Sequence, residues 1–394
     1  MQPLRQRFLQ YNAQTSGDPL LLEFERAEGI YLYDASGKKY TDLISGIGVS
    51  NVGHSHPRVV AAVQQQAARF MHLMVYGEFV QAPQVAFAEK LAGLLPGNLR
   101  TVYFTNSGAE ATEGALKLAK RFTGRTEIIA CKNSYHGSTQ GALSVMGNED
   151  YKAAFRPLLP GVRFIGFNRK EDLPLITRET ACVIIEAIQG EAGVRIPDKG
   201  YLQALRRRCH ETGALLILDE IQTGFGRSGS LFAFEQSGLI PDILLIAKAL
   251  GGGMPLGAFI ASGEIMNSLS QDPALGHITT FGGHPVSCAA GLAALEVLLE
   301  ENLPARAAEK HLLFKELLQH PAIRQFRGAG LLMALEFESF EQNKAIIDRC
   351  IEKGVITDWF LHDSRSMRLA PPLVITEEQI REACGIILES VRNS

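Results

Sequence analysis

One lysine stands between an apolar run and a glycine turn, in residues 243–255. The run Ile243–Ile246 is typical of a buried strand, so the amine of Lys248 is expected at the rim of that strand. Burial disfavours the charged form of an amine and therefore lowers its pKa. A neutral lysine amine can act as a nucleophile or form a Schiff base, which is the first chemistry that this sequence suggests.

A carboxylate ends a second apolar run of the same design. Residues 214–218 lead to Asp219 and Glu220, and open α/β sheets bind ligands at the C-terminal ends of their strands. A lysine and a carboxylate on neighbouring strands suit pyridoxal phosphate (PLP), which needs an amine for its aldehyde and an acid group facing its pyridinium nitrogen. Each residue alone also has an ordinary explanation, since lysines after strands are commonly solvated and an aspartate there commonly caps a helix.

A turn of small residues follows the predicted strand Thr101–Thr105 and leads into a helix predicted at 114–121. Small residues let backbone amides approach an anion, and a helix N-terminus adds a favourable partial charge. The turn therefore indicates a phosphate cup, although a plain capped helix fits the same residues. It lacks the lysine and the spacing of a Walker loop, so a nucleoside triphosphate is not the expected ligand.

Two more strand ends carry candidate side chains. The strand Glu127–Cys131 leads to Tyr135, whose ring could stack on a flat heterocycle or pack under its own loop. The strand predicted at 182–186 leads to a segment with two carboxylates, Glu186 and Glu191. We therefore place both segments at the same ligand-binding edge of the sheet.

The order of the predicted elements indicates an α/β fold. Strands alternate with helices, among them a helix at 201–211, which implies a mostly parallel sheet with helices on both faces. The first forty or so residues predict an irregular arm and a β-meander. Further elements are predicted at 57–70 (helix), 83–95 (helix), 286–300 (helix), 330–337 (strand), 342–353 (helix), 354–359 (strand), 367–370 (strand) and 377–391 (helix).

This order also predicts the domains. We expect an arm and part of a small domain in residues 1–50, a large domain in 51–285 and the remainder of the small α+β domain in 286–394. The length of 394 residues is enough for two or three such units.

Composition narrows the class of protein. The chain has 46% hydrophobic and 21% charged residues, and its net charge of −3 indicates no nucleic-acid partner. No apolar run approaches the roughly 18 residues that a membrane span needs, so none is expected. Its start lacks the apolar core of a signal peptide, and we expect a cytoplasmic protein. The six cysteines are widely spaced, so no disulfides are predicted. His54 and His56 stand beside a proline, where histidines more often close a loop than bind a metal, so no metal site is predicted.

Taken together, these segments resemble those of class III (fold type I) PLP-dependent aminotransferases, most closely the acetylornithine/ornithine aminotransferase branch. Each motif is short, but their order and spacing are specific, and the resemblance runs from about residue 25 to the C-terminus. The motifs are NSGAEA at 106–111, YHG at 135–137, EAIQGEAG at 186–193, DEIQTGFGR at 219–227, AKALGGG at 247–253, TFGG at 280–283 and RLAPPL at 368–373. The resemblance implies a large domain with a mostly parallel sheet and a smaller α+β domain built from the two termini.

The resemblance also implies roles around the cofactor. Lys248 would form the Schiff base with PLP and move the proton between the substrate Cα and C4′ of the cofactor. Asp219 would pair with the pyridinium nitrogen, Gln222 would hydrogen-bond the ring oxygen and Tyr135 would stack on the ring. The other residues expected at the cofactor are Ser107, Gly108 and Ala109 at the phosphate, and Glu186.

A threonine from the neighbouring subunit completes the phosphate site in this family, and the corresponding residue here is Thr280. The resemblance therefore implies a homodimer with shared active sites.

Two residues are implied at the substrate. Arg368 would grip a substrate carboxylate through paired hydrogen bonds, and Glu191 would neutralise that arginine while an ω-amino donor occupies the site. This implies amino transfer from such a donor, with acetylornithine or ornithine as the first candidates, to 2-oxoglutarate or another 2-oxo acid. Both substrates are small molecules of amino-acid metabolism.

The sequence also departs from this branch. Ser138 stands where an arginine usually binds a second carboxylate, which removes about 2–4 kcal/mol of binding unless Arg156 or Arg163 replaces it. Tyrosines usual in the N-terminal arm and near Ile47 are missing, and His284 replaces an asparagine. A diamine or another ω-amine therefore remains an alternative donor.

Other activities fit the same scaffold. A racemase, an aminomutase or a decarboxylase would retain Lys248 and Asp219, and only an aminotransferase would require an oxo-acid acceptor. A non-catalytic binding protein would be expected to lose Lys248, Asp219 or the phosphate loop, and all three are present.

Overall fold

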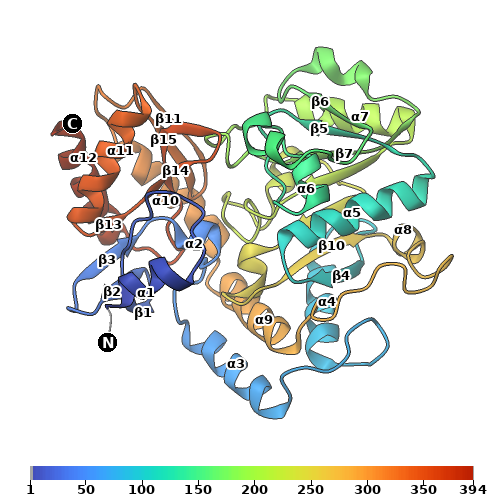
Figure 1. The fold of residues 1–394 in the computed structure, drawn as a ribbon, viewed down its shortest axis with the longest axis horizontal. Helices are drawn as coiled ribbons and strands as arrows, with labels where there is room; N and C mark the ends of the chain where they lie inside the picture. The colour runs from blue at the N-terminus through green and yellow to red at the C-terminus, as the bar shows by residue number, and fades with distance from the viewer. Residues whose placement is uncertain (1–2, 394) are drawn as a thin grey trace.

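Within residues 3–393, which the computed structural model describes, three β-sheets organise the chain (Figure 1). One sheet has seven strands and the other two have four each. The large sheet and its helices lie on one side of the molecule, and the two small sheets lie on the other side with both termini (Figure 1). Two residues of the predicted arm and the last residue of the predicted C-terminal unit lie outside this description.

The seven-stranded sheet has the order β4-β10-β9-β8-β7-β5-β6. Strand β10 is antiparallel to its neighbours β4 and β9, and the other pairs are parallel, which confirms the mostly parallel sheet. The strands are β4 (Thr101–Thr105), β5 (Glu127–Cys131), β6 (Val162–Ile165), β7 (Thr180–Glu186), β8 (Leu215–Asp219), β9 (Ile243–Ile246) and β10 (Gly257–Ala261).

Helices cover both faces of this sheet because its strands are apolar on both. On β8, Leu215 and Ile217 join one hydrophobic core, whereas Leu216 and Leu218 join the other. Side chains alternate between the faces of a strand, so the two cores lie on opposite sides of the sheet. Helix α5 (Gly108–Thr123) belongs to the first core, and α7 (Tyr201–Thr212) belongs to the second.

The two ends of the chain build the small sheets together. One has the order β1-β2-β3-β13 and contains the predicted meander as antiparallel pairs, with β13 parallel to β3. The other has the order β11-β12-β15-β14, with all pairs antiparallel. The strands are β1 (Phe24–Glu28), β2 (Tyr31–Asp34), β3 (Lys39–Asp42), β11 (Gln325–Ala329), β12 (Leu332–Glu336), β13 (Val355–Ile356), β14 (Asp358–Phe360) and β15 (Asp363–Leu369).

Five of the remaining helices, α3, α4, α9, α11 and α12, begin and end near the predicted residues. Helix α9 packs against α3 and α4. The domain boundary predicted at residue 286 stays a prediction. None of the helices in residues 3–393 has both the length and the apolar character that crossing a membrane requires. They are α1 (Leu4–Tyr11), α2 (Ser45–Gly48), α3 (Pro57–Arg69), α4 (Ala82–Leu94), α6 (Gln140–Ser144), α8 (Gly263–Asn267), α9 (Pro285–Glu300), α10 (Leu303–Leu317), α11 (Phe340–Glu352) and α12 (Glu377–Arg392).

Two predicted elements were wrong in their extent. The helix predicted at 114–121 begins six residues earlier, at Gly108, because the Ser107 side chain accepts a hydrogen bond from the Glu110 amide and caps it. The single strand predicted at 354–359 is two strands, β13 and β14, which belong to different small sheets. Strands β6, β10 and β11 and helices α2, α6, α8 and α10 were not predicted, and the arm predicted to be irregular contains helix α1.

Candidate active site

A cavity of about 730 Å³ opens at the C-terminal edge of the large sheet. The loops after β4, β5 and β9 contribute Ser107, Tyr135 and Lys248, and the last residues of β7 and β8, Glu186 and Asp219, line the same cavity. Parallel strands present their C-terminal ends at one edge, which is why residues far apart in sequence converge. The predicted adjacency of the two key strands is confirmed, since Asp219 pairs with Leu245 across β8 and β9.

One end of the cavity is suited to an anion. Ser107, Gly108 and Ala109 line it at the N-terminus of α5, where unpaired backbone amides and the helix dipole favour negative charge. The turn leaves no room for a side chain at Gly108, where an added Cβ would lie 2.8 Å from Cδ1 of Ile221. The Ile221 side chain therefore packs directly on the backbone at Gly108 and would have to shift for any larger residue.

Asp219 is held on the floor of the cavity by two fixed donors. Its Oδ1 accepts a hydrogen bond from the Ile221 amide at 2.9 Å, and its Oδ2 lies 2.7 Å from Nδ1 of His136. A carboxylate only accepts hydrogen bonds, so the His136 ring donates from Nδ1. His136 is buried, and its backbone oxygen accepts from the Thr112 hydroxyl at 2.9 Å. Sequence reasoning did not select His136, although it lies in the YHG motif.

Lys248 reaches the cavity from a strained backbone. Its φ of 50° is in the left-handed region, which residues other than glycine rarely adopt and which is found at functional sites. Burial lowers the pKa of Lys248, although the charges of Glu191, Asp219 and Glu186 act in the opposite direction. The predicted lowering of this pKa by desolvation thus agrees with the structure.

Glu186 lies beside Asp219, at the ends of the paired strands β7 and β8. Burial raises the pKa of Glu186 well above its ordinary value, and the neighbouring charge of Asp219 raises it further. Its side chain accepts backbone hydrogen bonds from Gly190 at 3.1 Å and Tyr135 at 3.4 Å. Glu186 therefore holds the backbone at Tyr135 and Gly190 in place around the cavity.

An ion pair closes the side of the cavity next to the small domain. Nη1 and Nη2 of Arg368 each donate to one oxygen of Glu191 at 2.9 Å, in the paired geometry that a guanidinium favours. Burial alone would raise the pKa of Glu191, but the charge and hydrogen bonds of Arg368 outweigh it and lower that pKa to about 2. Gln222 also donates to Glu191, at 3.2 Å. Glu191 is one of the described residues that line the cavity. Arg368 is not, and it lies behind the Glu191 carboxylate.

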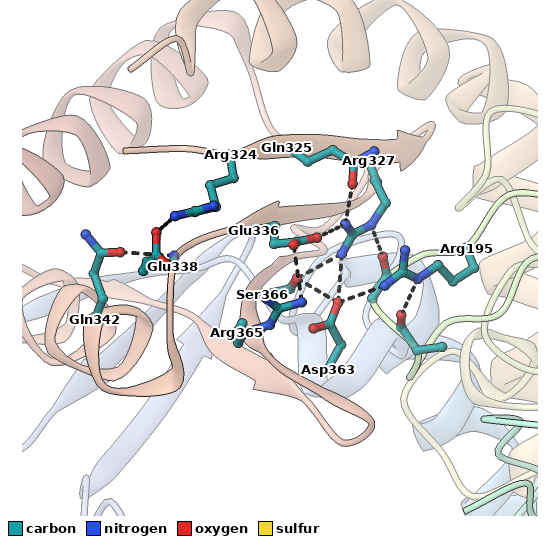
Figure 2. A network of polar contacts seen from close by, with 12 residues as sticks. Arg195, Arg324, Gln325, Arg327, Glu336, Glu338, Gln342, Asp363, Arg365 and Ser366 are labelled. Atoms are coloured by element: carbon teal, nitrogen blue, oxygen red, sulfur yellow. Dashed lines mark hydrogen bonds and ion pairs between the residues drawn. The ribbon is translucent and has the colours of Figure 1, made fainter. Parts of the chain in front are cut away.

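A polar network around Arg327, Asp363 and Arg195 joins the loop after β7 to the small domain (Figure 2). Nε of Arg327 donates to the Gly193 oxygen at 2.6 Å, and its Nη2 donates to Asp363 at 2.8 Å. An added Cβ at Gly193, where φ is 80°, would collide with the Asp363 carboxylate. The Glu191 backbone oxygen also accepts from the His362 amide at 2.9 Å. The position of Glu191 thus depends on contacts between the two domains.

Three residues that the sequence suggested for this site, Arg156, Arg163 and Thr280, lie apart from the cavity. Thr280 is exposed on the loop before α9 and is not among the described lining residues. Arg156 pairs with Glu149, and Arg163 pairs with Glu127 at 2.9 Å. Neither arginine is among the described lining residues, so the suggested replacement for an arginine at Ser138 is not found. Ser138 itself is exposed at the cavity and lies 3.2 Å from the Tyr135 hydroxyl.

The sequence model of the Aminotransferase class-III family matches residues 12–391, which is nearly the whole chain. The chain belongs to the class-III aminotransferase family. Its enzymatic class and the predicted fold type I are thereby confirmed, so this class-III aminotransferase transfers amino groups between small molecules.

Solved structures of other aminotransferases are similar over the full chain. The ornithine aminotransferase of Toxoplasma gondii is 33% identical with a TM-score of 0.91, covering 98% of this chain and 94% of that one. The adenosylmethionine-8-amino-7-oxononanoate aminotransferase of Methanocaldococcus jannaschii is 30% identical with a TM-score of 0.93, covering 99% of each chain. A thermostable omega transaminase from Pseudomonas jessenii is 26% identical with a TM-score of 0.93, covering 100% of this chain and 98% of that one.

Class-III aminotransferases depend on PLP, and the predicted cofactor is therefore confirmed. A structure of the Toxoplasma gondii ornithine aminotransferase is described with partial occupancy of PLP at its active site. The residues of this chain fit that cofactor, because an anion site, a buried carboxylate and a lysine of lowered pKa share one cavity of about 730 Å³. These groups match the phosphate, the ring nitrogen and the aldehyde of PLP.

Proposed function

We propose that this enzyme moves an amino group from an ω-amino donor to a 2-oxo acid, with ornithine or acetylornithine as the first candidate donors and 2-oxoglutarate as the first candidate acceptor. The Glu191–Arg368 pair is the observation that carries this proposal. While Glu191 neutralises Arg368, a terminal amine can approach the cavity without placing a carboxylate there. When an oxo acid arrives, its carboxylate can take the place of Glu191 on the same two nitrogen atoms.

We assign the cofactor contacts as the sequence predicts them. Ser107, Gly108 and Ala109 hold the phosphate, and Asp219, oriented by His136, holds the ring nitrogen in its protonated form. Bound PLP supplies an aldehyde and an electron-withdrawing ring that stabilises negative charge at the substrate Cα.

We assign the remaining side chains to positioning and proton transfer. Tyr135 covers the ring, Gln222 contacts the ring oxygen and Glu186 supports the loops beneath. Lys248 would hold the cofactor at its aldehyde and would move the proton at the substrate Cα, for which a lowered pKa is favourable.

A diamine or another ω-amine without an α-carboxylate is the second candidate donor. Ser138 offers a hydroxyl where a guanidinium would hold a second carboxylate, and Arg156 and Arg163 are engaged in ion pairs elsewhere. The similar structures include an omega transaminase, which agrees with either donor class.

We further propose that the enzyme is a homodimer in which Thr280 completes the phosphate site of the partner. Thr280 is exposed and points to no cavity of its own chain among the described pockets. Next to its loop, a groove of about 450 Å³ is lined by apolar residues of the segment 75–88 together with Thr279 and Gly282. Val80 in that segment is 94% exposed, which an apolar side chain at a subunit interface would explain.

The site of action is expected to be the cytoplasm, as the sequence predicts.

The test monitors each of the two half-reactions through the visible absorption of the bound cofactor. A panel of ornithine, acetylornithine and diamines is added without any oxo acid, and 2-oxoglutarate is then supplied. We expect the donor to convert the PLP spectrum to that of pyridoxamine phosphate and 2-oxoglutarate to restore it. Conversion by diamines alone would select the second donor class. A spectrum unchanged by every amine would contradict the proposed function.

A further inference from the structure

Arg368 has a second carboxylate partner that the sequence did not single out. Oδ1 of Asp358 accepts a hydrogen bond from Nε of Arg368 at 3.0 Å. The two residues are direct partners across the antiparallel strands β14 and β15 of one small sheet. Glu191, by contrast, comes from the loop after β7 in the other part of the molecule. Asp358 therefore stays next to Arg368 when the Glu191 side chain moves.

The two carboxylates bind different edges of the guanidinium. Glu191 takes Nη1 and Nη2, whereas Asp358 takes Nε. The Trp359 backbone oxygen accepts a further bond from Nη2 at 3.3 Å, and the Phe360 ring centre lies 4.7 Å from the guanidinium carbon. These contacts all come from β14, so one short strand fixes the plane of the guanidinium. The Nη1 and Nη2 edge faces Glu191 on the side of the cavity. Only this edge is therefore left for another carboxylate to take the place of Glu191.

We propose that Asp358 is a positioning residue for the oxo-acid half-reaction: it keeps the guanidinium of Arg368 oriented and paired while Glu191 gives way to the carboxylate of the acceptor. This inference rests on the proposed function, because it concerns the exchange of Glu191 for a substrate carboxylate. The acceptor carboxylate binds the Nη1 and Nη2 edge without displacing Asp358.

Charge pairing explains why the site needs this residue. Arg368 is 3% exposed, and a buried guanidinium left without a partner is strongly unfavourable. Without Asp358, the departure of Glu191 would leave the Arg368 guanidinium unpaired and would leave its side chain free to rotate. With Asp358 in place, Arg368 remains neutralised during the exchange. Burial raises the pKa of Asp358 to about 6 despite the nearby Arg368, as expected when two carboxylates share one guanidinium.

Binding of glutarate, a dicarboxylate that has no oxo group and cannot react, tests this role. Isothermal titration calorimetry on the PLP-loaded enzyme compares the wild type with Asp358→Ala, Asp358→Ser and Asp358→Asn. The Ala and Ser variants lack an acceptor in reach of Nε, and we expect glutarate to bind about ten-fold more weakly, with a similar rise in KM for 2-oxoglutarate. Asp358→Asn keeps an oxygen acceptor for Nε but loses the charge, so it should bind glutarate more weakly than the wild type, by about three-fold, and more tightly than the Ala variant.

Two controls separate positioning from general damage. Asp348→Asn removes a half-buried carboxylate on α11 that pairs with Lys344, in the same part of the chain, and should bind glutarate as the wild type does. The rate at which the terminal-amine donor converts the cofactor should be unchanged in every Asp358 variant that folds, because that half-reaction leaves Arg368 paired with Glu191. Should Asp358→Ala fail to fold, Asp358→Ser supplies the same comparison.

Two results would overturn the proposal. One is unchanged glutarate binding in Asp358→Ala and Asp358→Ser, and the other is an equal loss in both half-reactions, which would indicate a merely structural role. A wild type that reacts with no amine would instead reject the proposed function, and the glutarate measurement would still report whether Asp358 orients Arg368.

Discussion

The cofactor end and the carboxylate end of this active site are built in different ways. Asp219 and Lys248 follow neighbouring parallel strands of one sheet, and backbone hydrogen bonds fix their relative positions. Glu191 and Arg368 come from separate parts of the molecule and meet through an ion pair. The cofactor end is therefore a rigid scaffold, whereas the carboxylate end is a contact between charges that can be exchanged. We expect substitutions at the first to abolish chemistry and substitutions at the second to change substrate binding.

The largest effect is expected at Lys248. Lys248→Ala should lower kcat by about 1,000-fold or more, because the amine that binds the cofactor and moves the proton is lost. Steady-state kinetics and the visible spectrum of the PLP-loaded protein measure this change. Lys199→Ala, at an exposed lysine, is the matched control and should behave as the wild type. An active Lys248→Ala variant would remove Lys248 from the mechanism.

Asp219 should rank next. Asp219→Asn keeps the size of the side chain but removes the charge that holds the ring nitrogen protonated, so we expect kcat to fall by about 100-fold. Both half-reactions should slow together, because both need the same electron-withdrawing ring. Full activity in this variant would show that its role is assigned wrongly.

Arg368 should separate the two half-reactions. Arg368→Ala removes the receptor for the acceptor carboxylate, and we expect KM for 2-oxoglutarate to rise by about 30-fold. The terminal-amine donor should still convert the cofactor, since it makes no contact with the guanidinium. Rapid-mixing spectroscopy measures the rate of each half-reaction. An equal loss of rate in both would contradict the proposed difference between the cofactor end and the carboxylate end of the site.

The smallest effect concerns stability. The pKa of Glu191 is lowered in the folded state from its ordinary 4.5 to about 2, so its ionisation stabilises the fold above pH 4.5, and this contribution is lost as pH falls toward 2. Glu191→Gln should lower the free energy of unfolding on the order of 2 kcal/mol at pH 7, since Asp358 still pairs with Arg368. Denaturant titrations at several pH values should show the difference shrinking in acid. A difference that does not depend on pH would contradict the ion pair.

The same contrast explains what the sequence could predict. The strands carrying Asp219 and Lys248 are continuous apolar runs followed by polar residues, and such runs indicate both the element and its functional end. Asp358 could not be found in this way, because its partner is set by the register of β14 against β15. The predicted strand 354–359 merges two short strands because nothing local marks the point where the chain changes sheets.

Other misses have similar physical causes. His136 was passed over because its hydrogen bond to Asp219 joins residues 83 positions apart. Strand β10 is a short apolar segment, and periodicity alone cannot distinguish a buried strand of that length from part of a helix. Arg156 and Arg163 were plausible by charge alone, but ion pairs with Glu149 and Glu127 place them elsewhere. The roles assigned to the site residues, and Thr280 above all, remain predictions.

The most direct test of amino transfer with carboxylate exchange is the second half-reaction. The enzyme is first converted to its pyridoxamine phosphate form with the best donor, and the recovery of the PLP spectrum is then followed with 2-oxoglutarate or with an aldehyde that has no carboxylate. We predict rapid recovery with 2-oxoglutarate and recovery slower by about 30-fold or more with the aldehyde, because only the oxo acid can replace Glu191 on Arg368. Equal recovery with both compounds would contradict the exchange at Arg368, on which the proposed function rests.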